Sequence, residues 1–188
     1  MNRPILTAKL PLYAALVLLT QCSKCKDDVA PLDQLPPATQ TGANTFGCLV
    51  NGQAWTPNGR VGLSDNLVIQ YEASPTLGGN LNISAFRYSG SGSDTKQAIK
   101  VSASPIFQAR SFSLDFPYTE GSASYYDRAK LNPCNEYFYN DVSYRRGTLT
   151  LTKLDEQAGI IAGTFEFTVT KPGCDTVRVT QGRFDAKF

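Results

Sequence analysis

Period-two alternation is the sequence feature that most restricts the fold of this chain. After residue 44, short segments place apolar side chains at every second position, and clusters of Gly, Ser, Asn and Pro separate these segments. The clearest are Leu67, Ile69 and Tyr71; Leu81, Ile83 and Ala85; and Ile99, Val101 and Ala103. No convincing helical stripe follows residue 21. The pattern predicts an all-β, antiparallel domain over residues 45–188, either a β-sandwich or an up-and-down, meander-type barrel.

The dipeptide Asn51-Gly52 is the strongest turn signal in the chain. It follows an alternating segment, Phe46, Cys48 and Val50, and precedes Ala54 and Trp55. Asn-Gly tolerates the two positive φ angles of a type I′ turn, so these residues predict a β-hairpin. We therefore expect the folded domain to begin at Thr45.

The last strand changes parity. Val177 and Val179 point one way at odd positions, whereas Phe184, Ala186 and Phe188 continue at even positions. One face stays buried through such a change only if an extra residue is inserted, and Gly182 is the natural place for it. We expect residues 181–183 to interrupt the strand ladder.

The first 21 residues have the layout of a secretory signal. Arg3 and Lys9 are the only charges before Cys22, and residues 10–20 are uncharged and mostly apolar. At about 1.5 Å per residue this run spans only about half of a ~30 Å hydrocarbon core. It therefore predicts a cleaved signal peptide rather than a membrane-spanning helix.

Leu19-Thr20-Gln21-Cys22 resembles a lipobox, after which bacteria attach a diacylglyceryl group to the cysteine. Leu19 and Thr20 match the motif, and Gln21 departs from its usual small residue. Cys22 is therefore the predicted lipidation site, and acyl chains would hold the mature protein on a membrane. The alternative is an ordinary secretory signal beside an unrelated cysteine.

Residues 22–44 lack the alternation of the later chain. They contain three prolines and few large apolar residues. Such a composition predicts a flexible, disordered tether, which would follow the acylated N-terminus at Cys22. Fully extended, it would reach about 70 Å at ~3.3 Å per residue.

The chain contains no histidine, which excludes Ser-His-Asp and Cys-His catalysis and His-containing zinc sites. No phosphate-binding loop, dinucleotide fingerprint or EF-hand pattern is present. Five carboxylates lie in the middle of the chain without the diagnostic spacing of a glycosidase pair: Asp115, Glu120, Asp127, Glu136 and Asp141. We predict a protein that is not an enzyme and holds no cofactor or metal.

The balance of charge argues against a nucleic-acid partner. Without the signal, the chain carries 16 basic and 16 acidic residues. No basic patch with interleaved aromatic residues is present, so we expect no nucleic-acid partner.

Four cysteines remain after Cys22: Cys25, Cys48, Cys134 and Cys174. An exported protein meets an oxidising compartment, so disulfide pairing is expected, and four cysteines allow three connectivities. Cys134 and Cys174 both follow turn residues, whereas Cys48 alternates with apolar neighbours. We therefore predict a Cys134–Cys174 disulfide and a small, buried Cys48.

Residues 118–146 are rich in aromatic side chains amid polar ones. A platform of such rings could stack against sugars while Asn, Asp or Glu side chains hold the hydroxyl groups. The candidate stacking residues are Tyr125, Tyr126, Tyr137, Tyr139 and Tyr144. The alternative is that half of these aromatics cap one end of the core and the rest lie on edge strands.

Three segments, residues 38–55, 163–177 and 181–188, resemble a family of uncharacterised Bacteroidetes lipoproteins. The resemblance implies a secreted, single-domain, β-rich protein of the cell envelope and no particular activity. Lys26-Asp27-Asp28 also resembles the acidic export signal of surface lipoproteins in these bacteria. The expected location is the outer membrane, with lipid anchoring and cell-surface exposure.

Three functions are compatible with these features. The first is a surface-anchored module that binds a glycan or another envelope protein through the aromatic residues. The second is a lipocalin-like barrel that holds a small apolar ligand in a cavity lined by Phe112, Phe165 and Phe167. The third is a structural envelope protein without a ligand.

Overall fold

The computed structural model describes residues 29–88, 95–117, 120–138 and 144–188. The chain divides into two compact units, residues 1–30 and residues 31–188, and every described element belongs to the second. The predicted signal peptide, Cys22, Cys25 and Tyr139 lie outside the described residues. The elements are η1 (Pro31–Gln34), β1 (Thr45–Val50), β2 (Gln53–Trp55), β3 (Leu67–Glu72), β4 (Gly79–Tyr88), β5 (Thr95–Ile106), β6 (Ser111–Ser113), β7 (Gly121–Asp127), β8 (Glu136–Tyr137), β9 (Tyr144–Asp155), β10 (Ile160–Thr170) and β11 (Val177–Lys187).

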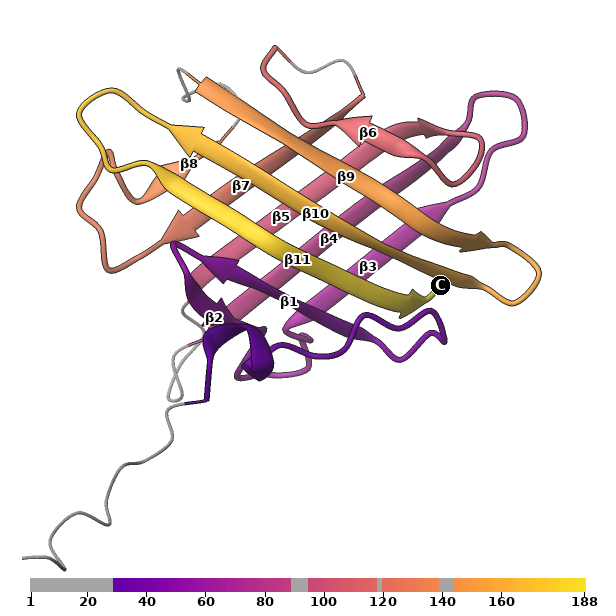
Figure 1. The fold of residues 1–188 in the computed structure, drawn as a ribbon, viewed down its shortest axis with the longest axis horizontal. Helices are drawn as coiled ribbons and strands as arrows, with labels where there is room; N and C mark the ends of the chain where they lie inside the picture. The colour runs from indigo at the N-terminus through magenta and orange to yellow at the C-terminus, as the bar shows by residue number, and fades with distance from the viewer. Residues whose placement is uncertain (1–28, 89–94, 118–119, 139–143) are drawn as a thin grey trace, which may run out of the picture. The chain divides into compact units, whose positions relative to one another are not determined.

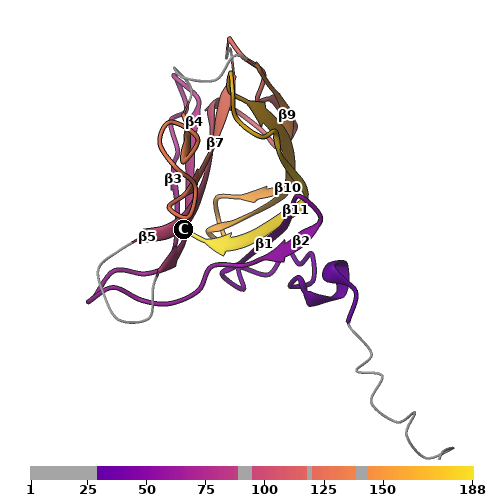
Figure 2. The same cartoon turned by 90° about the vertical axis from the view of Figure 1, so that its left-hand side faces the viewer.

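The strands form two antiparallel sheets that pack face to face. The six-stranded sheet has the order β2-β1-β11-β10-β9-β6, and the five-stranded sheet has the order β3-β4-β5-β7-β8. Strands of the two sheets cross steeply in Figure 1, and Figure 2 shows the five-stranded sheet on one side with the six-stranded sheet facing it. The all-β prediction is confirmed, and of its two alternatives the structure is the sandwich. Among the described residues, no helix is long and apolar enough to cross a membrane.

The alternating apolar residues fill the space between the sheets. Leu81, Ile83 and Ala85 on β4 are at most 1% exposed, as expected for strands with one face on a core. Phe112, Phe165 and Phe167 belong to the same buried cluster. The three phenylalanines that would line a ligand cavity in a barrel are thus core residues of the sandwich.

The Asn51-Gly52 hairpin is confirmed. Asn51 has φ of 49° and Gly52 has φ of 82°, the two positive values that a type I′ turn requires. The turn joins β1 to β2 and pairs Val50 with Gln53. This short hairpin forms one edge of the six-stranded sheet.

The predicted interruption of the last strand is also confirmed. Against β10, Phe165 faces Gly182 whereas Phe167 faces Val179, so β11 contains an extra residue at this point. The residue with positive φ is Gln181, at 53°, rather than the glycine beside it. The bulge lets both halves of β11 direct apolar side chains into the core.

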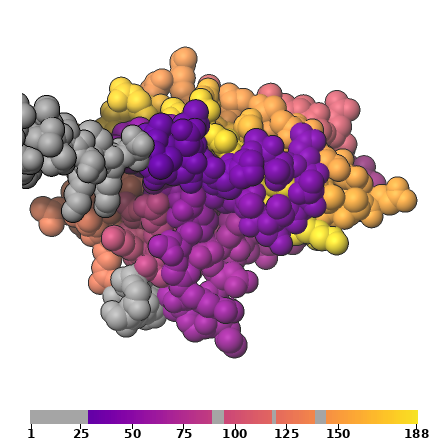
Figure 3. Space-filling view, turned by 60° about the horizontal axis from the view of Figure 1, so that its bottom comes forward, coloured from indigo at the N-terminus to yellow at the C-terminus, as the bar shows by residue number. Residues whose placement is uncertain are grey.

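The predicted tether is wrong over residues 31–44, which pack against the domain. Leu35 is only 7% exposed, and the compact unit starts at Pro31 rather than Thr45. We call residues 35–44 the N-terminal strap. In Figure 3 the indigo atoms of this part of the chain lie against yellow atoms of the C-terminal strand.

A single buried carboxylate holds the strap. Asp185 on β11 is 1% exposed and accepts hydrogen bonds from the Thr39 hydroxyl at 2.6 Å and from three backbone N–H groups. Thr41 donates at 2.9 Å, Gly42 at 2.7 Å and Ala43 at 3.3 Å. The backbone N–H groups of the strap thus donate hydrogen bonds to a carboxylate of the domain. This polar attachment is consistent with the low apolar content of the strap.

Candidate functional site

Two of the five candidate stacking tyrosines are core residues. Tyr125 is 5% exposed and Tyr137 is 2% exposed, and they pair across β7 and β8. Each hydroxyl has a partner: Tyr125 donates to Asp127 at 3.2 Å, and Tyr137 donates to the Asp175 carbonyl at 2.7 Å. Their selection as ligand-stacking residues is therefore wrong, because their rings complete the core and no ligand can reach them.

The other described candidates lie on opposite sheets. Tyr126 is half-buried on the outer face of the five-stranded sheet, next to Tyr125 but pointing the other way. Tyr144 is 45% exposed on β9 of the six-stranded sheet, where the Arg146 guanidinium lies 5.9 Å from its ring centre. The structure does not bring the described tyrosines into one platform.

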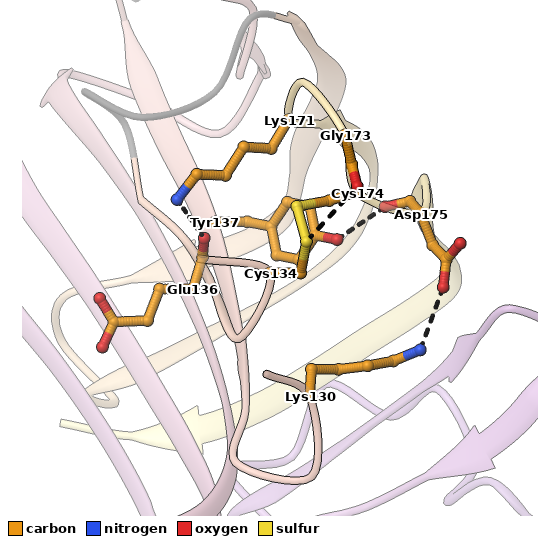
Figure 4. The surroundings of a disulfide bond; sticks show 8 residues. All are labelled: Lys130, Cys134, Glu136, Tyr137, Lys171, Gly173, Cys174 and Asp175. Carbon is orange, nitrogen blue, oxygen red and sulfur yellow. Dashed lines mark hydrogen bonds and ion pairs between the residues drawn. A yellow bond between two sulfur atoms is a disulfide. The ribbon is translucent and has the colours of Figure 1, made fainter. Parts of the chain in front are cut away.

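The predicted disulfide is confirmed and belongs to a structural corner of the domain. Cys134 and Cys174 are bonded, with their Cα atoms 5.4 Å apart. Figure 4 shows how the bond ties the segment after β7 to the turn between β10 and β11. Lys130 adds an ion pair to Asp175 at 3.1 Å across the same junction. The disulfide thus pins the irregular aromatic stretch to the C-terminal strands, beside the buried Tyr137.

Cys48 is the free, buried cysteine that its alternation predicts. It is fully buried, and burial raises its pKa to about 12 although the nearby Arg87 acts in the opposite direction. A thiol that stays protonated is a poor nucleophile and a poor metal ligand. Among the described residues, no group of three or more His, Cys, Asp or Glu side chains is placed to hold a metal ion.

Several of the central carboxylates hold the fold together. Glu120 pairs with Arg110 at 2.9 Å and accepts the Ser113 N–H at 3.1 Å, and these bonds lower its pKa. Asp127 accepts from Gln97 at 3.0 Å, and Asp115 accepts the Gly147 N–H at 3.0 Å. Each of these acids already has a structural role.

A different row of aromatic side chains stands on the outer face of the five-stranded sheet. The register places Phe86 on β4 opposite Ala98 on β5, and Ala98 opposite Tyr126 on β7. Because neighbouring strands lie about 4.8 Å apart, Phe86 and Tyr126 flank Ala98 at a separation of about 10 Å. Ala98 is only 7% exposed although it points outward, and the Tyr88 ring stacks on Phe86 at 5.6 Å.

Hydroxyl and amide groups continue this face beside the aromatic row. The next cross-strand row is Ser84, Lys100 and Ser124, and the row after it is Asn82, Ser102 and Ser122. The hydroxyls of Ser102 and Ser122 are 3.1 Å apart. These two rows line a hollow of about 250 Å³ that Phe138 borders on one side. We call the whole surface the serine–aromatic face: Asn82, Ser84, Phe86, Tyr88, Ala98, Lys100, Ser102, Ser122, Ser124, Tyr126 and Phe138.

The sequence contained a signal for this face. In β4 the inward residues are at odd positions, and the intervening even positions read Asn82, Ser84, Phe86 and Tyr88. Two large aromatic residues in succession at outward positions are unusual for a strand whose outer face is solvated. The aromatic-rich residues 118–146 include Tyr126 but not its partners on β4, Phe86 and Tyr88.

Larger hollows lie on the outer face of the six-stranded sheet, with volumes of about 590 and 550 Å³. Both contain Thr148 and Glu166, and arginines border them, Arg146 in one and Arg183 in the other. The aromatic residues in their walls are Phe112, Phe165 and Phe167, whose rings are buried in the core. These hollows therefore offer no outward ring for stacking, and their mixed charges are typical of a solvated sheet face.

Comparison of the chain with protein-family models, curated proteins and solved structures finds no match. The candidate site therefore depends on the geometry of the serine–aromatic face.

Proposed function

We propose that this protein is an exported, lipid-anchored envelope protein whose β-sandwich binds a glycan without catalysis. The serine–aromatic face is the binding surface in this proposal. The observation that carries it is the outward row of Phe86, Ala98 and Tyr126, directly beside rows of hydroxyl and amide groups. Ligand sites combine apolar surface with a few well-placed polar groups, and this face has both.

The chemistry of the face suits a sugar. A sugar ring has an apolar C–H face that packs on an aromatic ring and a rim of hydroxyls that both donate and accept hydrogen bonds. Ser hydroxyls likewise donate and accept, and the Asn82 side chain adds an amide with both capacities. The hollow of about 250 Å³ next to the rings gives one sugar unit a place to enter the polar rows.

A non-catalytic role fits the chemical groups that are present. The chain has no histidine, and Glu120, Asp127 and Asp115 are engaged in structural hydrogen bonds. The hollow itself is lined by serines, one asparagine and one lysine among its polar residues. This set can hold a ligand but has no acid–base pair for hydrolysis.

The proposed location depends on the N-terminal features. The signal-like residues 1–21, the lipobox-like stretch ending at Cys22 and the resemblance to Bacteroidetes lipoproteins all support export and anchoring to the outer membrane, with the domain at the cell surface. Labelling of the protein with a fatty-acid analogue, and loss of the label in Cys22→Ala, tests this part. Retention of the label in Cys22→Ala would contradict it.

A glycan array probed with the detergent-solubilised full-length protein tests the binding function. We expect Phe86→Ala and Tyr126→Ala to weaken binding about tenfold, the effect of losing one well-packed aromatic contact. Tyr144→Ala is the matched control, because it removes an exposed tyrosine from the opposite sheet. Absence of any bound glycan, or equal binding by Tyr126→Ala and Tyr144→Ala, would overturn the proposal.

A further inference from the structure

We infer that the ligand of the serine–aromatic face is an acidic glycan and that Lys100 binds its carboxylate or sulfate group. This inference rests on the proposed glycan-binding function and specifies its ligand class. Lys100 is exposed at the middle of β5, the central strand of the five-stranded sheet. Among the described residues that line the hollow, it alone carries a charge.

The register of the sheet defines the surroundings of Lys100. Its cross-strand neighbours are Ser84 and Ser124. Its neighbours on the same face along β5 are Ala98 and Ser102, and four further residues lie at the diagonal positions. The diagonal residues are Asn82, Phe86, Ser122 and Tyr126. None of these eight neighbours is acidic, and the nearest carboxylate in the register, Glu136 on β8, lies one strand further out, opposite Tyr126.

Some other cations of the described domain are held in ion pairs. Lys130 lies 3.1 Å from Asp175, Lys153 lies 3.6 Å from Asp155, and Arg110 lies 2.9 Å from Glu120. Within the described part of the chain Lys100 has no ion pair, as is also true of the exposed Lys96 and Lys187, and it differs from these two in lining the hollow. A solvated sheet face normally intersperses both signs of charge, so a single cation inside a neutral, polar hollow favours an anionic ligand.

The arrangement also matches the shape of an acidic sugar. The row of Lys100 and the row of Phe86 and Tyr126 are two residues apart along the strands, which corresponds to about 7 Å. A sugar stacked on the aromatic row can therefore place a carboxylate or sulfate attached to its ring over Lys100. The serine hydroxyls on both sides of Lys100 can donate further hydrogen bonds to the same anion.

The test compares charged and neutral forms of the same polymer with the solubilised full-length protein. The methyl ester of polygalacturonate keeps the sugar backbone and replaces the charged carboxylate with a neutral ester, and dextran sulfate and dextran provide the sulfate comparison. We expect the acidic member of at least one pair to bind more tightly, and its binding to weaken as salt screens the charge. Which pair responds identifies the carboxylate or the sulfate as the preferred anion.

The decisive variant is Lys100→Gln, with Lys187→Gln as the control that removes an exposed lysine from the other sheet. We expect Lys100→Gln to weaken binding of the acidic polymer roughly fivefold and to leave the neutral polymer unaffected, and Lys187→Gln to change neither. Circular dichroism confirms that both variants are folded.

Two negative outcomes are distinguishable. In the first, neutral and acidic polymers bind equally, Lys100→Gln has no effect, and Tyr126→Ala still weakens the binding of both polymers. The preference for an acidic glycan is then wrong, whereas the proposed glycan-binding face is retained. If no polymer binds, or Tyr126→Ala binds as the unmodified protein does, the proposed function fails and this inference fails with it.

Discussion

Phe165 on β10 lies directly across the sheet from Gly182 on β11, and its ring covers the glycine. A Cβ atom at residue 182 would lie 2.6 Å from two ring carbons and would also meet the Phe165 carbonyl oxygen. Two more glycines have the same relationship: Gly147 lies across from Phe167, and Gly163 lies across from Phe184. In the six-stranded sheet, bulky inward rings are thus accommodated by cross-strand glycines, a device that also permits strong local curvature.

Gly182→Ala should therefore destabilise the domain by about 1–3 kcal/mol, the usual cost of overpacking a well-filled core. The backbone at residue 182 does not have positive φ, so the expected cost comes from the contact with Phe165 and not from backbone strain. Urea unfolding of the variant measures the change. Thr180→Ala, on the same strand at an outward position, should change the free energy of unfolding by less than about 0.5 kcal/mol. Equal stability of the two variants would contradict the prediction.

The strap should detach in Asp185→Asn. Burial by itself would raise the pKa of Asp185, but the hydrogen bonds from Thr39, Thr41, Gly42 and Ala43 outweigh it and lower the pKa to about 2. An asparagine side chain lacks the charge that these donors stabilise. We expect the variant to lose about 2 kcal/mol or more of stability and to show faster hydrogen exchange at the amides of residues 41–43. Unchanged exchange at those amides would show that the strap is held by other contacts.

The same carboxylate makes a defined contribution to acid unfolding. Its folded-state pKa of about 2 is below the ordinary value of 3.8. The stabilisation is therefore present above pH 3.8 and is lost as the pH falls toward 2, a change of about 2 kcal/mol. The free energy of unfolding, measured between pH 5 and pH 2, should depend less on pH in Asp185→Asn than in Asp65→Asn. Asp65 is the control because its carboxylate is exposed in the unmodified protein. Parallel profiles for the two variants would refute this contribution.

The disulfide should contribute about 3–4 kcal/mol in the chain-entropy model, because it closes a loop with a sequence separation of 40. The double variant Cys134→Ser and Cys174→Ser should accordingly unfold at a lower urea concentration than the oxidised protein. Lys130→Gln is the control: it removes the neighbouring ion pair to Asp175, which is exposed and screened by solvent, so its loss should change stability far less. A double variant as stable as this control would mean that the loop is already constrained in the unfolded chain.

Local sequence patterns predicted those parts of the fold that depend on neighbouring residues. The Asn51-Gly52 turn, the parity change near Gly182 and the alternation within each strand are all properties of short segments, and all were confirmed. The disulfide was predictable because Cys134 and Cys174 both follow turn residues. Long-range packing decides which strands share a sheet. The alternation of apolar residues therefore could not distinguish a β-sandwich from a β-barrel.

The strap and the serine–aromatic face depend on contacts between distant residues. Thr39 and Asp185 are 146 positions apart, and nothing near either residue indicates that they meet. The aromatic row likewise combines Phe86 with Tyr126 through pairing with β5. Within residues 118–146, composition could not distinguish an inward tyrosine from an outward one, because that depends on the exact register of β7.

Tyr125 and Tyr126 provide a direct test of that register, since adjacent tyrosines on one strand point in opposite directions. Tyr125 is 5% exposed in the core, so Tyr125→Ala should cost about 3–5 kcal/mol of stability, as expected for deletion of a buried aromatic ring. Tyr126 lies half-buried on the serine–aromatic face, so Tyr126→Ala should cost much less and should act mainly on ligand binding. Urea unfolding of both variants, with binding measured on whichever remains folded, separates the two roles. A larger loss of stability in Tyr126→Ala than in Tyr125→Ala would mean that β7 is shifted by one residue, and the proposed face would then point into the core.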